Sequence, residues 1–122
     1  MKGSVMGFLS NLFGPPVPSI DATTAQAKLS EKPKPLVLDV REPSEYAAGH
    51  IAGSTLIPLP QLAQRMSELP RDREIICVCA SGSRSSSAAR HLMRNGYTVL
   101  NMSGGMSRWM HAGLPLKKGM GK

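Results

Sequence analysis

One loop constrains the fold of this chain more than any other stretch. Residues 79–85 read Cys-Ala-Ser-Gly-Ser-Arg-Ser, and the apolar run 74–78 leads directly into them. That run is typical of a buried strand, and the helix-forming residues 86–93 follow the loop. The sequence therefore predicts a strand, a tight loop and the start of a helix in direct succession. Small residues let several backbone N–H groups converge there, at the positive end of a helix, in an arrangement that binds anions.

Cys79 stands where the predicted strand ends, so we expect its sulfur to face the concave side of the loop. A free thiol titrates near ~8.5, and a helix N-terminus lowers that value. Arg84 adds a fixed positive charge. The pattern indicates a thiolate nucleophile whose anionic adduct is held by N–H donors, with Cys79 as the catalytic residue. The candidates for binding the anion are Ala80, Ser81, Gly82, Ser83, Arg84 and Ser85. The alternative is that Cys79 is a small buried side chain, as cysteines in apolar strands commonly are.

The second cysteine, Cys77, lies in the middle of the apolar run, and we expect it in the core. A disulfide to Cys79 would be strained at a separation of two residues. Two cysteines do not make a disulfide framework, so nothing demands an oxidising compartment. We therefore expect a cytoplasmic protein.

The formal net charge is +7, with basic residues spread along the chain. There are five aromatic residues (one Trp, two Tyr, two Phe) and no alternation of basic and aromatic side chains. The charge therefore favours small anions or an acidic partner, and it does not indicate a nucleic-acid surface.

The chain divides into three parts. Residues 1–18 form an extension with apolar residues at helical spacing and a Pro-rich linker; residues 19–116 form one domain; residues 117–122 form a basic tail. The stretch 1–14 is too short and too broken to cross a membrane. We favour an amphipathic helix that docks on the domain itself; contact with a membrane or a partner is the alternative.

Within the domain, short apolar strands alternate with helical segments, which predicts an α/β fold with a mainly parallel sheet covered by helices on both faces. Strands are expected at residues 36–40, 54–57, 74–78 and 97–101, and helices at 22–29, 42–48, 58–69, 86–94 and 102–111. Ligands of such sheets lie beyond the carboxyl ends of the strands. Asp39 and Arg41 fall at such an end, as Cys79 does. We expect them to support the site, chiefly as an ion pair that fixes neighbouring loops.

Four segments together resemble the rhodanese-like sulfurtransferases. They are residues 38–46, 49–54, 79–85 and 101–109, in the order found in that family. Ser54 and Met106 depart from the residues usual in the family, but neither touches the chemistry. The resemblance implies a three-layer rhodanese-like domain. It also implies that Cys79 takes sulfur from a donor such as thiosulfate, holds it as a persulfide, and passes it to a thiophilic acceptor such as cyanide or a thiol.

The same resemblance implies no cofactor and no metal ion, and a small anionic sulfur donor as partner. His50 falls in a family turn and is expected to have a structural role. A relay that carries sulfur between proteins is a variant of this chemistry. Two rivals stay open: a non-catalytic binding module, and a phosphatase or arsenate reductase of the same fold. The phosphatases place one residue more between Cys and Arg, whereas this chain has the four residues 80–83 there. The shorter loop should crowd a tetrahedral phosphate.

Overall fold

The computed structural model describes residues 15–122, so the helix expected within residues 1–14 lies outside the described part of the chain. The described residues fold around a five-stranded sheet in the order β1-β5-β4-β2-β3. Every strand pair is parallel, which confirms the predicted α/β class. The strands are β1 (Ser19–Ile20), β2 (Leu36–Asp39), β3 (Thr55–Leu56), β4 (Ile75–Val78) and β5 (Val99–Met102).

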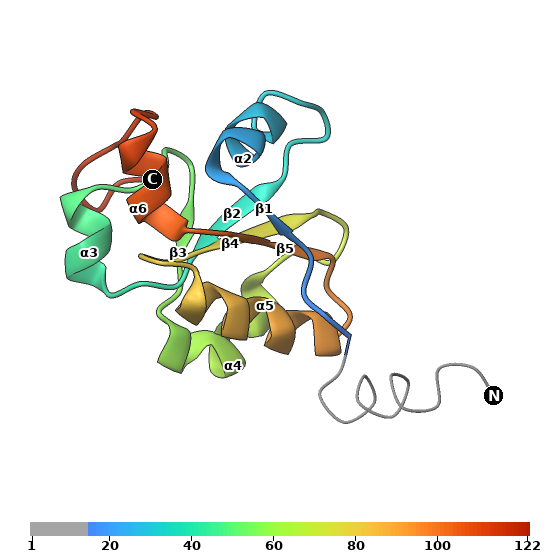
Figure 1. Cartoon of the computed structure of the whole chain (residues 1–122). Helices are drawn as coiled ribbons and strands as arrows, with labels where there is room; N and C mark the ends of the chain where they lie inside the picture. Colours follow the sequence, from blue (N-terminus) through green and yellow to red (C-terminus); the bar gives the residue numbers. More distant parts are fainter. Residues whose placement is uncertain (1–14) are drawn as a thin grey trace.

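Helices cover both faces of the sheet (Figure 1). On one side lie α2 (Ala22–Lys28) and α6 (Gly105–His111); on the other lie α4 (Leu62–Arg65) and α5 (Ser83–Arg94); α3 (Pro43–Ala48) follows β2. Strand β4 contributes side chains to the cores on both faces of the sheet, because successive side chains of a strand point to opposite faces. Ile75 and Cys77 belong to the core beneath α5, and Ile76 and Val78 to the core beneath α2 and α6.

Helix α5 packs closely on the sheet because most side chains on its inner face are small. Its buried residues are Ser85, Ala88, Ala89 and Leu92, at the spacing of a single helical face. This face sets the distance between the helix and the strand that precedes it. It also directs the first turn of α5 toward the end of β4.

The largest differences from the sequence expectation are an additional strand, the junction of β5 with α6, and the helix expected at 58–69. Strand β1 was not predicted; it is two residues long and pairs with β5. The same pairing includes Met102 in β5. Gly104, in the left-handed region (φ 76°), is the N-cap residue of α6, so this helix begins later than expected. The helix expected at 58–69 is divided into η1 (Leu59–Gln61), α4 and η2 (Met66–Glu68). Backbone bonds between residues three apart tighten both of its ends, from Gln61 to Pro58 and from Leu69 to Met66.

The C-terminal segment runs back along α3. Lys117 pairs with His50 in an isolated antiparallel bridge, and the Gly119 N–H donates to the Ala47 carbonyl at 2.8 Å. The His50 ring is fully buried, lies 2.7 Å through Nε2 from the Gly121 carbonyl oxygen, and stacks on Tyr46 at 3.7 Å. His50 therefore holds the C-terminal segment in place, while the boundary proposed at residue 116 stays a prediction. Within residues 15–122 we find no helix with the length and apolar character that a bilayer crossing requires.

Candidate active site

The candidate site lies at the edge where the parallel strands end. Strands β2 and β4 run side by side, with Asp39 level with Val78. The residues that follow them, Arg41 and Cys79, therefore emerge at the same edge, as expected for a ligand site in an open α/β sheet. The N-terminal turns of α3, α5 and α6 surround this edge.

The loop encloses the Cys79 sulfur. The Gly82 N–H donates to Sγ at 3.0 Å, and the Ser85 hydroxyl donates at 3.3 Å. Gly82 adopts φ 104° as the residue before α5, a conformation that side chains rarely take. The relative exposure of Cys79 is 0%, so its sulfur lies inside the loop, with the donors of Gly82 and Ser85 beside it.

These donors favour the ionised thiol. Burial by itself raises the pKa of Cys79, but the Ser85 hydroxyl and the backbone N–H groups of Ser85, Gly82 and Ser81 outweigh it and lower the pKa below its ordinary value. Cys77 has no such donors: burial, with a smaller contribution from Cys79, raises the pKa of its thiol to about 12. The two cysteines therefore differ in chemistry, although both lie in the core layer beneath α5. Cys77 is a core residue, as expected.

The first turn of α6 supports the loop from behind. The backbone N–H groups of Met106 and Ser107 donate to the carbonyls of Cys79 and Ala80, at 2.8 and 3.0 Å. Gly105 makes this approach possible, because a Cβ there would lie 2.4 Å from the Cys79 carbonyl oxygen. With the carbonyls of Cys79 and Ala80 bound to α6, the amides that follow turn toward the sulfur. The sequence argument missed this role, although the Gly-Gly pair at 104–105 was a signal for it.

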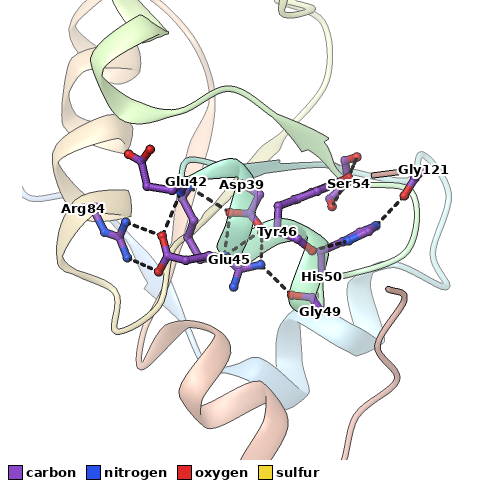
Figure 2. A network of polar contacts seen from close by, with 10 residues as sticks. Asp39, Glu42, Glu45, Tyr46, Gly49, His50, Ser54, Arg84 and Gly121 are labelled. Carbon is purple, nitrogen blue, oxygen red and sulfur yellow. Dashed lines mark hydrogen bonds and ion pairs between the residues drawn. The ribbon is translucent and has the colours of Figure 1, made fainter. Parts of the chain in front are cut away.

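Arg84 points toward α3 (Figure 2). Its two terminal nitrogens donate to the two oxygens of Glu45, at 2.8 and 2.9 Å. This ion pair, and more weakly the Glu42 N–H and the charge of Arg41, lowers the pKa of Glu45 to about 2 against some opposition from burial. Glu45 in turn raises the pKa of Arg84. Any contact of Arg84 with a bound anion stays a prediction, and its partner Glu45 was not foreseen. Ser83 is exposed, and its hydroxyl lies 3.3 Å from that of Ser81.

Asp39 lies next to this network (Figure 2) and forms a buried ion pair with Arg41. The side chains are 1% and 6% exposed, with Arg41 Nη2 2.8 Å from Asp39 Oδ2. Nη2 also donates to the Gly49 carbonyl at 2.8 Å, and the Arg41 N–H donates to Asp39 Oδ1. The pair therefore fixes the turns at both ends of α3, which agrees with the structural role preferred from the sequence.

Other possible ligand sites are separate from this loop. A hollow of about 390 Å³ between α2 and α6 has Asp21, Thr23, Ser103, Arg108 and His111 in its lining, and no residue of 79–85. Over the described range 15–122, no three His, Cys, Asp or Glu side chains gather as a metal site would need.

Comparison with known proteins agrees with this geometry. The family model of the rhodanese-like domain matches residues 21–112. A sulfurtransferase of Allochromatium vinosum is 39% identical over 101 residues, which span 82% of this chain and 94% of that protein. The thiosulfate sulfurtransferase GlpE of Pseudoalteromonas translucida is 37% identical over 83 residues, 67% of this chain and 79% of GlpE.

The crystal structure of a rhodanese-related protein from Thermoplasma volcanium superposes with a TM-score of 0.77 at 34% identity. The superposition covers 82% of this chain and 97% of the Thermoplasma volcanium chain. The residues matched by the family model include the loop around Cys79. The chain belongs to the family of rhodanese-like domains, and it resembles single-domain sulfurtransferases of that family.

Proposed function

We propose that this protein is a sulfurtransferase that carries sulfane sulfur as a persulfide on Cys79, with thiosulfate as a donor. One observation carries the proposal: the Cys79 sulfur accepts hydrogen bonds from the Gly82 N–H and the Ser85 hydroxyl within a loop that lowers its pKa. A thiolate is the nucleophilic form of cysteine. The described hydrogen bonds make that form accessible without a general base.

In the first step, the Cys79 thiolate attacks the outer sulfur of thiosulfate. The new S–S bond forms as the bond between the outer sulfur and the sulfonate breaks, and sulfite leaves with the electron pair. In the second step, an acceptor such as cyanide or a thiolate attacks the terminal sulfur, and Cys79 leaves as a thiolate. Covalent catalysis thus divides one transfer into two. The loop donors stabilise the negative sulfur in both steps.

The loop residues have different roles in this proposal. Ser81, Gly82 and Ser85 supply donors to sulfur. Ala80 is held by α6 through its carbonyl and so orients the amides that follow. Arg84 ties the loop to α3 through Glu45, and Ser83 lies at the exposed rim, where it can meet an incoming anion. Asp39 and Arg41 support the loops at the same edge.

A protein can replace either small molecule as donor or acceptor. The net charge of +7 supports an acidic partner in such a relay. A phosphatase activity has less support. The loop has only four residues between Cys79 and Arg84, and the Arg84 guanidinium is already paired with Glu45. We further propose a reducing, cytoplasmic setting. The mechanism needs a free thiol, and both cysteines are free here.

Incubation with thiosulfate followed by intact-mass measurement tests the proposal. We expect the mass to rise by one sulfur atom, to return to its original value when cyanide is added, and to yield thiocyanate. Peptide mapping should place the sulfur on Cys79, and Cys79→Ser should abolish the gain. No gain of sulfur in the folded wild type, or a phosphate found on Cys79 after incubation with a phosphate ester, would reject it.

A further inference from the structure

Asn101 is a buried polar residue that the mechanism above does not use. It lies near the end of β5, level with Cys77 on β4, and is 8% exposed. Its side-chain amide Nδ2 donates to the Gly82 carbonyl at 3.2 Å. Among residues 15–122, its Oδ1 has no hydrogen-bond partner. The hydrogen bond from Nδ2 to the Gly82 carbonyl is therefore the contact that can explain this side chain.

The contact fixes the orientation of the amide. If the amide were flipped, Oδ1 would face the Gly82 carbonyl oxygen, and two acceptors would oppose each other. A buried polar side chain also lowers stability unless its contacts compensate. Asn101 has one buried polar atom, Oδ1, without a partner, so a role in packing alone does not explain an Asn at this position. Its position against the sulfur-binding loop is a better explanation.

Gly82 links Asn101 to the reactive sulfur. The Gly82 carbonyl accepts from Asn101 Nδ2 and from the Ser86 N–H, and the Gly82 N–H donates to Cys79 Sγ at 3.0 Å. Gly82 is in the left-handed region, at φ 104°. Because glycine has no side chain and is conformationally permissive, nothing in Gly82 itself holds this geometry. External contacts at its carbonyl must therefore hold it.

We propose that Asn101 is a positioning residue, which holds Gly82 so that its N–H points at the Cys79 sulfur. Asn101 itself does not touch the reacting atoms. The inference rests on the proposed role of Cys79 as the sulfur-carrying nucleophile. It adds a residue from β5 to the machinery of a loop that lies between β4 and α5.

The pKa of the Cys79 thiol is the readout, because a merely structural role for Asn101 would not move it. Cys77 on β4 and Arg84 on α5 interact electrostatically with this thiol, and Glu45 on α3 is the ion-pair partner of Arg84. None of them changes in the variants used here. Ultraviolet absorbance of the thiolate reports Cys79 alone at moderate pH, since Cys77 titrates only at about 12.

The test compares Asn101→Leu, which keeps the shape and loses the donor, with Asn101→Ala and with Asn95→Ala. Asn95 also donates its amide to a carbonyl of α5, that of His91, but at the far end of the helix. We expect Asn101→Leu to raise the Cys79 pKa by about one unit, which is about tenfold less thiolate below that pKa. Sulfur loading from thiosulfate should slow by the same factor, while Asn95→Ala leaves both unchanged.

A Cys79 pKa equal to wild type in either folded Asn101 variant overturns the proposal, whatever happens to its melting temperature. Failure of both variants to fold also overturns it, in favour of a structural role. The titration needs no sulfur donor, so its result is separate from that of the proposed function. A wild type that takes up no sulfur would reject the function and leave the Asn101 comparison intact.

Discussion

Arg84 and Glu45 form a bidentate ion pair between the sulfur-binding loop and α3, with N–O distances of 2.8 and 2.9 Å. Glu45 also accepts the Glu42 N–H at 2.9 Å in the capping box of α3. One carboxylate therefore joins the start of α3 to the start of α5. Because the charge of Arg84 is balanced by this partner, the lowered pKa of Cys79 depends on hydrogen-bond donors.

We expect Glu45→Gln to lower the free energy of unfolding at neutral pH by about 1 kcal/mol or less, since the two side chains are 36% and 32% exposed. The pKa of Glu45 is lowered to about 2 in the folded state, so its stabilising effect is present above the unfolded value of 4.5 and is lost as the pH falls toward 2. Urea unfolding across that range should show wild type and variant converging at low pH. A difference that grows as the pH falls would contradict this.

Ser85→Ala removes the hydroxyl donor to Cys79 Sγ. We expect the pKa of Cys79 to rise by about half a unit to one unit, because the remaining backbone donors no longer offset burial as fully. The pH profile of sulfur loading should move upward by the same amount. Ser87→Ala is the matched control, an exposed serine of the same helix. Equal profiles for the two variants would show that the Ser85 hydroxyl does not act on the thiol.

Gly105→Ala and Gly53→Ala separate backbone strain from contact with the loop. Both glycines have positive φ, 57° and 83°, so each substitution adds about 1–2 kcal/mol of strain. A Cβ on Gly53 meets nothing within 4 Å, whereas one on Gly105 lies 2.4 Å from the Cys79 carbonyl oxygen. We expect a further loss of about 1–3 kcal/mol for Gly105→Ala, together with slower sulfur loading, and near-normal loading for Gly53→Ala. Thermal unfolding and loading kinetics check both.

Cys77→Ala should keep sulfur transfer and lose roughly 1–2 kcal/mol of stability, because Cys77 packs in the core with 0% exposure. Thiocyanate formation and chemical unfolding measure the two effects. Loss of transfer equal to that of Cys79→Ser, in a folded variant, would instead show that the two cysteines act as a pair.

Asp39→Asn should destabilise the domain by about 3–5 kcal/mol, because it leaves the buried charge of Arg41 without its partner. The double variant Asp39→Asn with Arg41→Met should recover part of that loss, since neither charge remains buried. Unfolding curves of the wild type, the single variant and the double variant test the prediction. A single variant as stable as wild type would show that the pair has no structural role.

The class of the fold and the identity of the loop could be predicted from the amino-acid sequence. Alternating apolar strands and helical segments predicted the parallel sheet, because strands buried on both faces are continuously apolar. Cys79 at the end of such a strand, followed by small residues and a helix, predicted a thiol at the carboxyl edge of the sheet. The Asp39–Arg41 pair could be expected because its residues are neighbours in the chain.

The groups that contact the loop could not be predicted in this way, because they come from distant parts of the chain. Glu45, Asn101 and Gly105 lie far from Cys79 along the chain, and folding brings α3, β5 and α6 to the edge where Cys79 lies. Strand β1 is two residues long and exists only because β5 offers it an edge. Local sequence patterns report periodicity and turn chemistry, whereas hydrogen bonds between distant elements depend on how those elements pack. The burial of Cys79 follows from that packing.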